Sequence, residues 1–227
     1  MTEQRLALVT GANRGLGWAV AAELYRRGLR VVVTAREEPA ARVAAARLGG
    51  EVLACQLDVT DAESVTRARK EVGPVDILIS NAAVLLDGGT NPLSVPLHLV
   101  QRTIDVNLLG SWRVAQAFVP DMVGRGWGRV VFISSATGSF GVGLFTHAPG
   151  YAVSKAGING LTQMLAAHTT GTGVLVNAVN PGTTRTRMMP TGERSPEEAA
   201  LDVVDAALLP DDGPSGTFRR GNRVLSW

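Results

Sequence analysis

The chain has 227 residues, of which 45% are hydrophobic, 5% aromatic and 19% charged, and its formal net charge is +2 at pH 7. A chain of this length can bury about 70% of the surface of its unfolded state, so a full hydrophobic core is available. The small charge excess, without a run of five like charges, excludes the clustered basic face that nucleic-acid binding requires.

Cysteine, histidine and hydropathy patterns exclude further classes. Cys55 is the only cysteine, so it is predicted to be a buried small side chain without an intrachain disulfide, in agreement with a cytoplasmic protein. The segment 1–5 is polar and lacks the features of a signal peptide. No apolar run reaches the ~18 residues of a membrane span. The three histidines lie far apart without metal-ligand spacing, so we expect no metal site.

The first third of the chain alternates strand-like and helix-like segments. In chain order we predict a strand at 5–10, a helix at 16–27, a strand at 30–34, a helix at 39–48, a strand at 52–57, a helix at 61–72 and a strand at 75–79. Gly28 is placed to end the first helix, and Asp61 is a suitable N-cap for the third.

The alternation continues to the end of the sequence. We predict a loop at 87–96, a long helix at 97–122, a strand at 128–133, a glycine-rich loop at 138–150, a helix at 151–168, a strand at 174–179, a helix from Ser195 that stops at Pro210, and an edge strand at 223–225. The predicted strands are continuous apolar runs, typical of a parallel sheet buried on both faces. The expected fold is therefore α/β, a Rossmann-like doubly wound parallel sheet of about seven strands with helices on both faces, in a single domain over 1–227.

The turn after the first predicted strand is suited to a dinucleotide. Gly11 permits a tight turn, and Gly15 and Gly17 let the backbone approach a pyrophosphate at the start of a helix. The spacing G-x-x-x-G-x-G differs from the common G-x-G-x-x-G fingerprint, and an ordinary glycine-rich turn is the alternative.

The end of the second predicted strand bears on which nucleotide binds. Arg36 is the first charged residue after that strand, and Arg14 in the glycine loop is a second candidate for the same phosphate. Two guanidinium groups suit a 2′-phosphate, which indicates NADP(H). The alternative is that Glu37 binds the ribose, which would indicate NAD.

Taken together, these residues resemble the short-chain dehydrogenase/reductase family along nearly the whole chain. The matching motifs are Thr10, Gly11, Gly15 and Gly17; Asp58 with Val59; Ser80-Asn81-Ala82-Ala83; Asn107; Ser135; Tyr151 and Lys155; and Asn180-Pro181-Gly182 with Thr186. Two positions depart from the family's N-N-A-G motif, and Ala83 replaces its glycine. Arg14, Arg36 and the ending 218–227 look most like NADPH-dependent carbonyl reductases.

The resemblance implies the site residues. The cofactor-binding set is Gly11, Asn13, Arg14, Gly15, Leu16, Gly17, Arg36, Asp58, Val59, Asn81, Ala82, Ala83, Tyr151, Lys155, Pro181, Gly182, Thr184 and Thr186. The catalytic set is Asn107, Ser135, Tyr151 and Lys155. In the family, the lysine also holds the nicotinamide ribose, and the asparagine orders a water that links the lysine to solvent.

Tyr151 and Lys155 are four residues apart on a predicted helix and therefore share one face. The lysine ammonium is expected to lower the tyrosine pKa from its reference value near 10 toward the working range of a proton donor. Ser135 is expected to donate to the substrate oxygen, with Ser134 as a competitor. Without the resemblance, the tyrosine and lysine could be a surface pair and Asn107 a helix residue bonded to a carbonyl.

We therefore expect an enzyme that transfers a hydride between NADP(H) and a small carbonyl or alcohol substrate, most readily by reducing a ketone or aldehyde. The alternatives are an alcohol dehydrogenase, a secondary-metabolism ketoreductase and a non-catalytic NADP(H)-binding sensor. The short segment 186–195 predicts an open and less selective site. A homodimer or homotetramer through the Tyr151 helix is a further expectation, although packing within one chain would use the same residues.

Overall fold

The computed structural model describes residues 4–227, so the first three residues of the polar 1–5 segment lie outside the described part of the chain. Eight strands form one sheet in the order β3-β2-β1-β4-β5-β6-β7-β8. They are β1 (Leu6–Val9), β2 (Arg30–Ala35), β3 (Leu53–Gln56), β4 (Ile77–Ser80), β5 (Gly128–Ile133), β6 (Val174–Val179), β7 (Phe218–Arg220) and β8 (Arg223–Val224).

The sheet confirms the predicted doubly wound parallel topology. Every pair from β3 to β7 is parallel, and only the last pair, β7 with β8, is antiparallel. All residues of β1, β4, β5 and β6 are buried, which explains why these strands are continuous apolar runs. The strand order reverses between β1 and β4, and a crevice at the carboxyl ends of strands opens at such a switch point.

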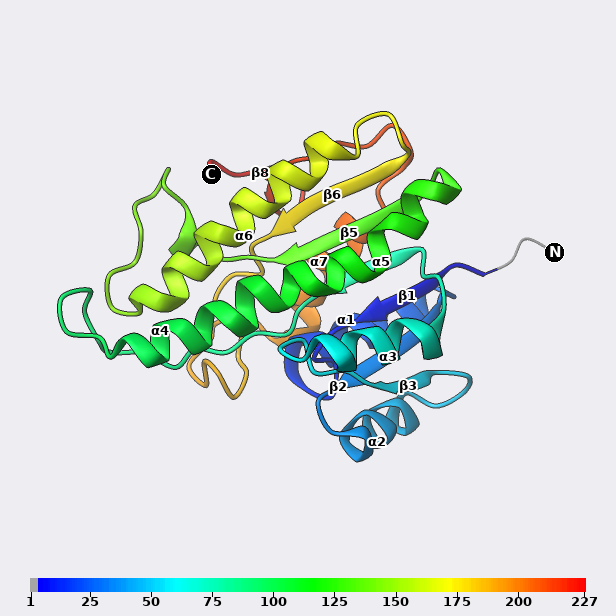
Figure 1. The fold of residues 1–227 in the computed structure, drawn as a ribbon, viewed down its shortest axis with the longest axis horizontal. Helices are drawn as coiled ribbons and strands as arrows, with labels where there is room; N and C mark the ends of the chain where they lie inside the picture. The colour runs from blue at the N-terminus through cyan, green and yellow to red at the C-terminus, as the bar shows by residue number, and fades with distance from the viewer. Residues whose placement is uncertain (1–3) are drawn as a thin grey trace.

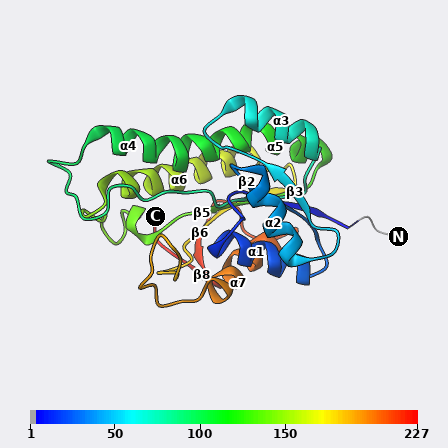
Figure 2. The ribbon, with the colours of Figure 1, turned by 90° about the horizontal axis from the view of Figure 1, so that it is seen from below.

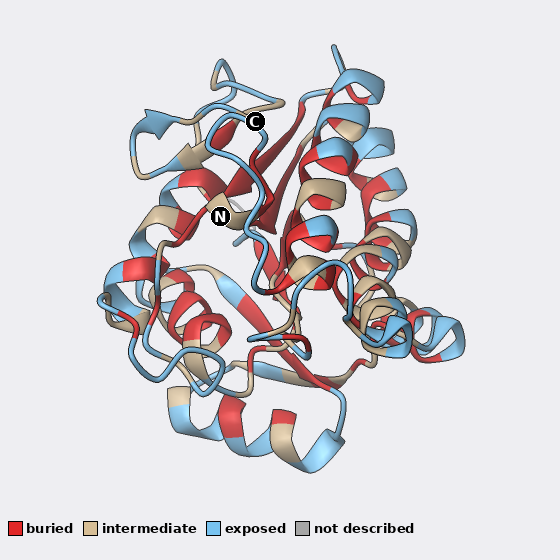
Figure 3. Ribbon diagram, turned by 90° about the vertical axis from the view of Figure 1, so that its left-hand side faces the viewer, coloured by how far each residue is buried: buried red, intermediate tan, exposed pale blue. Residues whose placement is uncertain are grey.

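The helices form two layers (Figures 1 and 2). They are α1 (Gly15–Arg26), α2 (Glu38–Leu48), α3 (Ala62–Val72), α4 (Leu97–Ile104), α5 (Ser111–Arg125), α6 (Pro149–His168) and α7 (Pro196–Ala207). One core cluster joins Ala7 and Val9 of β1 to α1, α2 and α7, whereas Leu6 and Leu8 belong to the cluster with α3, α5 and α6. Successive side chains of a strand point to opposite faces, so the two layers cover opposite faces of the sheet. The buried residues accordingly gather in the strands and on the inner sides of the helices (Figure 3).

The predicted helix at 97–122 contains a local change of winding. A π-helical turn, Asp105–Gly110, links α4 to α5, and the last helical residue is Arg125, before Gly126 in the left-handed conformation. Single π turns inside helices occur frequently at functional sites. This one contains Asn107 and lies where α4 runs beside α6 (Figure 1).

Two further elements depart from or refine the predictions. β7 extends the sheet by one strand beyond the seven predicted. Asp61 caps α3 as predicted, because its side chain accepts a hydrogen bond from the backbone N–H of Glu63 at 2.9 Å. Across residues 4–227, no helix combines the length and apolarity needed to cross a bilayer.

Candidate functional site

The glycine loop after β1 is fastened to the end of β4. The hydroxyl of Thr10 accepts hydrogen bonds from the backbone N–H groups of Asn81 at 2.9 Å and Ala82 at 3.0 Å. Gly11 has a φ of +62°, and a Cβ there would lie 3.0 Å from the Cα of Ala82. A Cβ on Gly17 would overlap the side-chain amide of Asn81, so these glycines permit the close approach of the loop and β4.

The N-terminus of α1 directly follows the glycine loop and has no side-chain cap. Arg14 occupies the N-cap position in extended conformation, no side chain caps the helix, and its first turn contains no acidic residue. The first N–H groups of the helix are therefore available to an anion, which the positive end of the helix dipole also favours. Thr186 borders the same place, since its Cγ2 lies 3.4 Å from where a Cβ on Gly15 would stand. This arrangement fits a pyrophosphate.

Arg14 and Arg36 are both exposed, and neither joins an ion pair within residues 4–227. Glu37, the alternative ribose ligand, is also exposed, at the N-cap of α2. Asp58 follows β3, and its Oδ1 accepts from the N–H and the hydroxyl of Thr60 at 2.9 and 2.7 Å. These residues follow adjacent strands, so the predicted adenosine-side residues share one edge of the sheet.

Lys155 and Tyr151 lie on α6 where it passes the end of β5. The Lys155 side chain is buried, its Nζ donates to the carbonyl of Ile133 at 2.8 Å, and the same Nζ lies 5.4 Å from the centre of the Tyr151 ring. Because Ser134 and Ser135 directly follow Ile133, the predicted lysine, tyrosine and serine positions come together here. The surface-pair alternative is wrong for Lys155, which is only 3% exposed.

The two serines after β5 have different surroundings. The hydroxyl of Ser134 is buried and donates to Oδ1 of Asn159 at 2.6 Å, so it belongs to the core. Ser135 is partly exposed, and its oxygen accepts from the N–H and hydroxyl of Thr137 at 3.2 and 2.9 Å. Since Ser135 accepts both of these bonds, its own hydroxyl proton is left for a ligand.

Asn107 connects the π turn to the segment after β4. Its Oδ1 accepts from the N–H of Val84 at 2.8 Å, and its Nδ2 donates to the Val84 carbonyl at 2.9 Å and to the Ser154 hydroxyl at 3.0 Å. Ser154 in turn donates to the carbonyl of Tyr151 at 2.7 Å. The side chain thus joins α6 to the segment that follows Asn81 and Ala83, and its role in ordering a water stays a prediction.

Burial controls the ionisation of the pair on α6. It raises the pKa of Tyr151 to about 12 and lowers the pKa of Lys155 to about 8, since a low-dielectric environment disfavours phenolate and ammonium alike. The expected lowering of the tyrosine pKa by the lysine is therefore wrong for the protein chain by itself. Tyr151 is protonated at neutral pH, as a proton donor must be, and Lys155 changes charge close to the physiological range.

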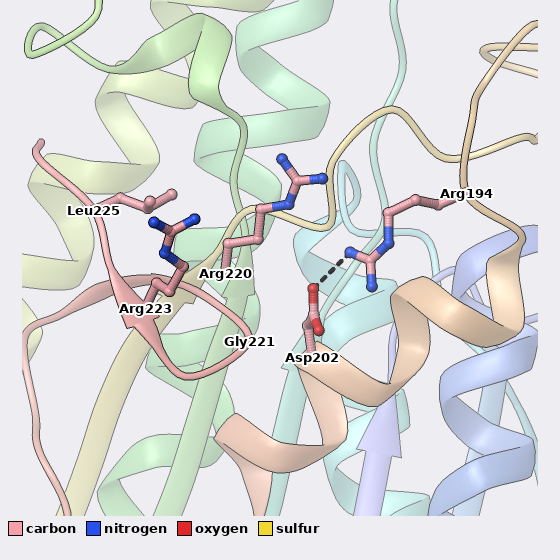
Figure 4. Close-up of a pocket in the computed structure, with 6 residues that line it drawn as sticks. All are labelled: Arg194, Asp202, Arg220, Gly221, Arg223 and Leu225. Carbon is pink, nitrogen blue, oxygen red and sulfur yellow. Dashed lines mark hydrogen bonds and ion pairs between the residues drawn. The ribbon is translucent and has the colours of Figure 1, made fainter.

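Arg194 holds the segment that follows β6. Its guanidinium donates to the Pro181 carbonyl at 2.8 Å, the Glu198 carbonyl at 2.8 Å and the Asp202 carboxylate at 2.6 Å, and Arg194 also pairs with Thr184 in an isolated bridge. Figure 4 shows this ion pair. Both residues line a hollow of about 530 Å³, together with residues of the β7–β8 hairpin. None of the predicted catalytic residues lines that hollow, so we assign Arg194 to supporting the Pro181–Gly182 turn.

Arg194→Ala is expected to lower the free energy of unfolding by about 2 kcal/mol or more, because it removes charge-assisted hydrogen bonds and leaves the largely buried Asp202 carboxylate unpaired. Urea denaturation monitored by circular dichroism measures the change. Arg223→Ala is the matched control, since Arg223 lines the same hollow but is exposed and forms no ion pair within residues 4–227; a change within about 0.5 kcal/mol is expected there. Equal losses in the two variants would contradict the assignment.

The loop between Ser135 and α6 is braced by the last residues of the sequence. Ser139 donates to the carbonyl of Ser226 at 2.9 Å, and the N–H of Gly141 donates to the carbonyl of Trp227 at 2.6 Å. The Trp227 ring stacks on Phe218 of β7 at 5.6 Å. The loop also carries exposed apolar side chains, among them Phe140 within the braced part and Phe145 beyond it.

Neither the cysteine nor a metal site offers further chemistry within residues 4–227. Cys55 is buried as predicted, and burial raises the pKa of its thiol to about 12, so it is a poor nucleophile. Across residues 4–227, no group of three or more His, Cys, Asp or Glu side chains is arranged to hold a metal ion.

The chain is similar to known proteins along most of its length. The family model for short chain dehydrogenase matches residues 5–196. The 3-oxoacyl-[acyl-carrier-protein] reductase MabA of Mycobacterium tuberculosis is 34% identical over 206 residues, covering 89% of this chain and 78% of that protein. Oxidoreductase UcpA of Salmonella typhimurium is 37% identical over 220 residues, covering 90% and 81%. A crystal structure of an actinorhodin polyketide ketoreductase with NADPH superposes with a TM-score of 0.84 at 30% identity, covering 97% and 98%.

Proposed function

Because the chain belongs to the short-chain dehydrogenase family of NAD(P)(H)-dependent oxidoreductases, we propose that it is an NADPH-dependent reductase that converts a small ketone or aldehyde into the corresponding alcohol. One observation carries this proposal: Lys155, with Tyr151 beside it on α6, is bonded to Ile133 at the end of β5, two residues before Ser135, and the N-terminus of α1 after β1 is uncapped. An acid, a cation and a hydroxyl donor are the groups that a carbonyl needs when it is reduced.

The residues of the crevice fit the cofactor. The free N–H groups of α1 would bind the pyrophosphate, Arg14 and Arg36 the 2′-phosphate, and Asp58 the adenine. Lys155 would bind the nicotinamide ribose. When bound, NADPH supplies the hydride that reduces the carbonyl carbon.

The chain itself supplies the proton and orients the substrate. Ser135 would donate a hydrogen bond from its free hydroxyl to the carbonyl oxygen, keeping its proton, and so stabilise the negative charge that develops there. Tyr151 then transfers its phenolic proton to the same oxygen, giving the alcohol. The Lys155 ammonium stabilises the phenolate that is left, and solvent returns the proton by way of Lys155 and the Asn107 region.

Direction and substrate range separate the alternatives. An alcohol dehydrogenase or a secondary-metabolism ketoreductase would use the same residues, whereas a sensor would bind NADPH without turnover. A fluorescence titration with NADPH and NADH, followed by a panel of aldehydes, ketones and diketones, distinguishes these cases. Activity on several small carbonyls is expected, because the segment 186–195 is short. A protein that binds neither nucleotide would overturn the proposal, and activity on one bulky sterol alone would overturn the expected range.

The rate is expected to fall at alkaline pH because of Lys155. The value of kcat/KM for NADPH reports groups of the cofactor-free enzyme, in which the pKa of Lys155 is about 8. As the pH rises through that value the ammonium is lost, so kcat/KM should fall about tenfold per further pH unit. Tyr151, with a pKa of about 12, stays protonated over this range. Initial rates from pH 6 to 10 give the profile. Lys155→Met should have a low kcat/KM that does not fall further at alkaline pH. A wild-type kcat/KM that stays constant to pH 10 would contradict the assignment of this pH dependence to Lys155.

Self-association through α6 stays a prediction. Leu108 occupies the place next to Gly157 within the chain, so this glycine serves internal packing. Gly160 has open space around it and Met164 is largely exposed, so these residues are free to meet a second copy.

A further inference from the structure

The helix that carries Tyr151 and Lys155 has no N-cap of its own. α6 begins at Pro149, and the N-cap position is Ala148, which has no side-chain acceptor. The first N–H groups of a helix have no partner within the helix, and an uncapped end loses about 1 kcal/mol compared with a capped one. Tyr151 is the third residue of α6, so it lies in the turn that capping controls.

A carboxylate from a distant loop takes the place of the missing cap. Oδ2 of Asp87 accepts hydrogen bonds from the N–H of Gly150 at 2.5 Å and, at 3.4 Å, from the N–H of Tyr151. These are the second and third residues of the helix, the same N–H groups that a local N-cap side chain would bind. A Cβ at position 150 would lie 3.0 Å from that oxygen, so glycine allows the carboxylate to approach closely.

Asp87 is fixed in this position. The residue is fully buried, and its own carbonyl accepts from the hydroxyl of Thr90 at 2.7 Å. Two residues further on, the N–H of Gly89 donates to the carbonyl of His147, just before α6, at 2.8 Å. The loop after β4 is therefore bonded to the start of the helix on both sides of Pro149.

The burial of this carboxylate requires an explanation. Its Oδ1 is buried and has no hydrogen-bond partner within residues 4–227. Burying a charged group with an unsatisfied oxygen is unfavourable unless other interactions compensate. Here the helix itself compensates the carboxylate, through two N–H groups and the positive end of its dipole. These contacts indicate that Asp87 has a structural role at the start of α6.

We propose that Asp87 is a positioning residue of the reductase, which caps α6 from the loop after β4 and thereby holds the phenol of Tyr151 at the substrate oxygen. The inference rests on the proposed function, and Asp87 itself touches neither substrate nor cofactor. Without the cap, the first turn of α6 frays and Tyr151 moves with it. A misplacement of about 1 Å at a reacting group can lower a rate by about 10²-fold.

The test compares Asp87→Ala with Asp61→Ala, which removes an N-cap from a different helix. At saturating NADPH, Asp87→Ala is expected to lower kcat by about 10- to 100-fold and to leave the Kd for NADPH within about twofold. Asp87→Asn should lie between, because the amide oxygen can still accept from Gly150. Asp61→Ala removes an aspartate cap of the same kind from α3, under an edge of the sheet remote from β5. Asp61→Ala should lower the free energy of unfolding by about 1 kcal/mol, the usual loss of an N-cap, without a change in kcat.

A second-site change separates capping from other effects of Asp87. Ala148→Asp in the Asp87→Ala background installs a local capping side chain at the N-cap position. If Asp87→Ala lowers kcat about 100-fold, the double mutant is expected to have a kcat at least tenfold higher than Asp87→Ala alone. Unchanged rates in Asp87→Ala would overturn the proposal, as would a double mutant that regains no activity although α6 is capped again.

Amide hydrogen exchange gives a readout that does not depend on turnover. Peptides covering residues 149–156 should exchange faster in Asp87→Ala than in wild type or Asp61→Ala, and slow again in the double mutant. Should Asp87→Ala fail to fold, Asp87→Asn takes its place in both assays. If the amides of residues 149–156 exchange in Asp87→Ala at the wild-type rate, Asp87 does not cap α6. If they exchange faster but kcat stays at the wild-type value, Asp87 caps the helix without positioning Tyr151. A wild-type protein without carbonyl reductase activity sinks the proposed function, whereas exchange still decides whether Asp87 caps α6.

Discussion

Tyr151→Phe is expected to lower kcat for ketone reduction by about 10²- to 10⁴-fold, the usual contribution of a positioned general acid. The substitution removes only the phenolic hydroxyl group, and the ring can keep its place 5.4 Å from Nζ of Lys155. Because the pKa of Tyr151 is about 12, the wild-type enzyme carries this proton at every pH at which the reduction is measured. NADPH should still bind, although more weakly if Tyr151 contributes a contact, because the substitution leaves all other proposed cofactor-binding residues in place.

The measurement combines steady-state rates with a fluorescence titration of NADPH. Tyr25→Phe is the matched control, because Tyr25 is the only other tyrosine and lies on α1 next to Gly50, away from β5. It should retain wild-type kcat. If Tyr151→Phe reduces ketones at the wild-type rate, Tyr151 is not the acid. If wild type binds NADPH without turning over any carbonyl, the sensor alternative gains support.

The parallel sheet was predictable because its cause is local. A strand covered on both faces must be apolar at every position, as Ile77–Ser80 nearly is, and this pattern is visible without knowing the partners of the strand. β7 shows the limit of that reasoning. Phe218–Arg220 has one apolar residue and two arginines, and it becomes a strand because Ala178 and Val179 of β6 offer it an edge.

The π turn that contains Asn107 could not be predicted from the sequence, for a different reason. A π turn adds one residue to a turn, and over six residues this changes the hydrophobic period too little to be detected. The choice between Ser134 and Ser135 likewise needed a residue 25 positions away, Asn159, which binds the first serine in the core. The pKa of Tyr151 moved opposite to expectation because its burial outweighs a lysine that the same burial tends to neutralise.

Asp87 and Arg194 were missed because their roles are non-local. In the sequence, Asp87 is one polar residue in a Gly/Pro-rich loop, and its contact with Gly150 spans 63 positions. The available signal was negative: the predicted helix that carries Tyr151 is preceded by Ala148-Pro149 and lacks a Ser, Thr, Asp or Asn to cap it. A helix start with a first-turn proline and no capping residue indicates that the cap comes from elsewhere in the fold.

Arg36→Asp is expected to change the ratio of the Kd for NADPH to the Kd for NADH by about 10²-fold in favour of NADH. A guanidinium bonded to a phosphate contributes about 1.5–3 kcal/mol, which its removal forfeits. The new carboxylate would also repel the 2′-phosphate and can accept from the two ribose hydroxyls of NADH. Arg36 is exposed and free of ion pairs within residues 4–227, so the substitution disturbs no internal contact of that kind.

The same strand provides the control for this exchange. Arg30 begins β2 at the edge of the sheet opposite the crevice and is exposed like Arg36, so Arg30→Asp changes the net charge equally without reaching the nucleotide. Titrations of both variants with both nucleotides at one ionic strength separate a local effect from a general one. A ratio altered only in Arg36→Asp, and altered further when Arg14 is also replaced, places the 2′-phosphate between these two arginines. A ratio unchanged in Arg36→Asp would mean that the 2′-phosphate site is misassigned.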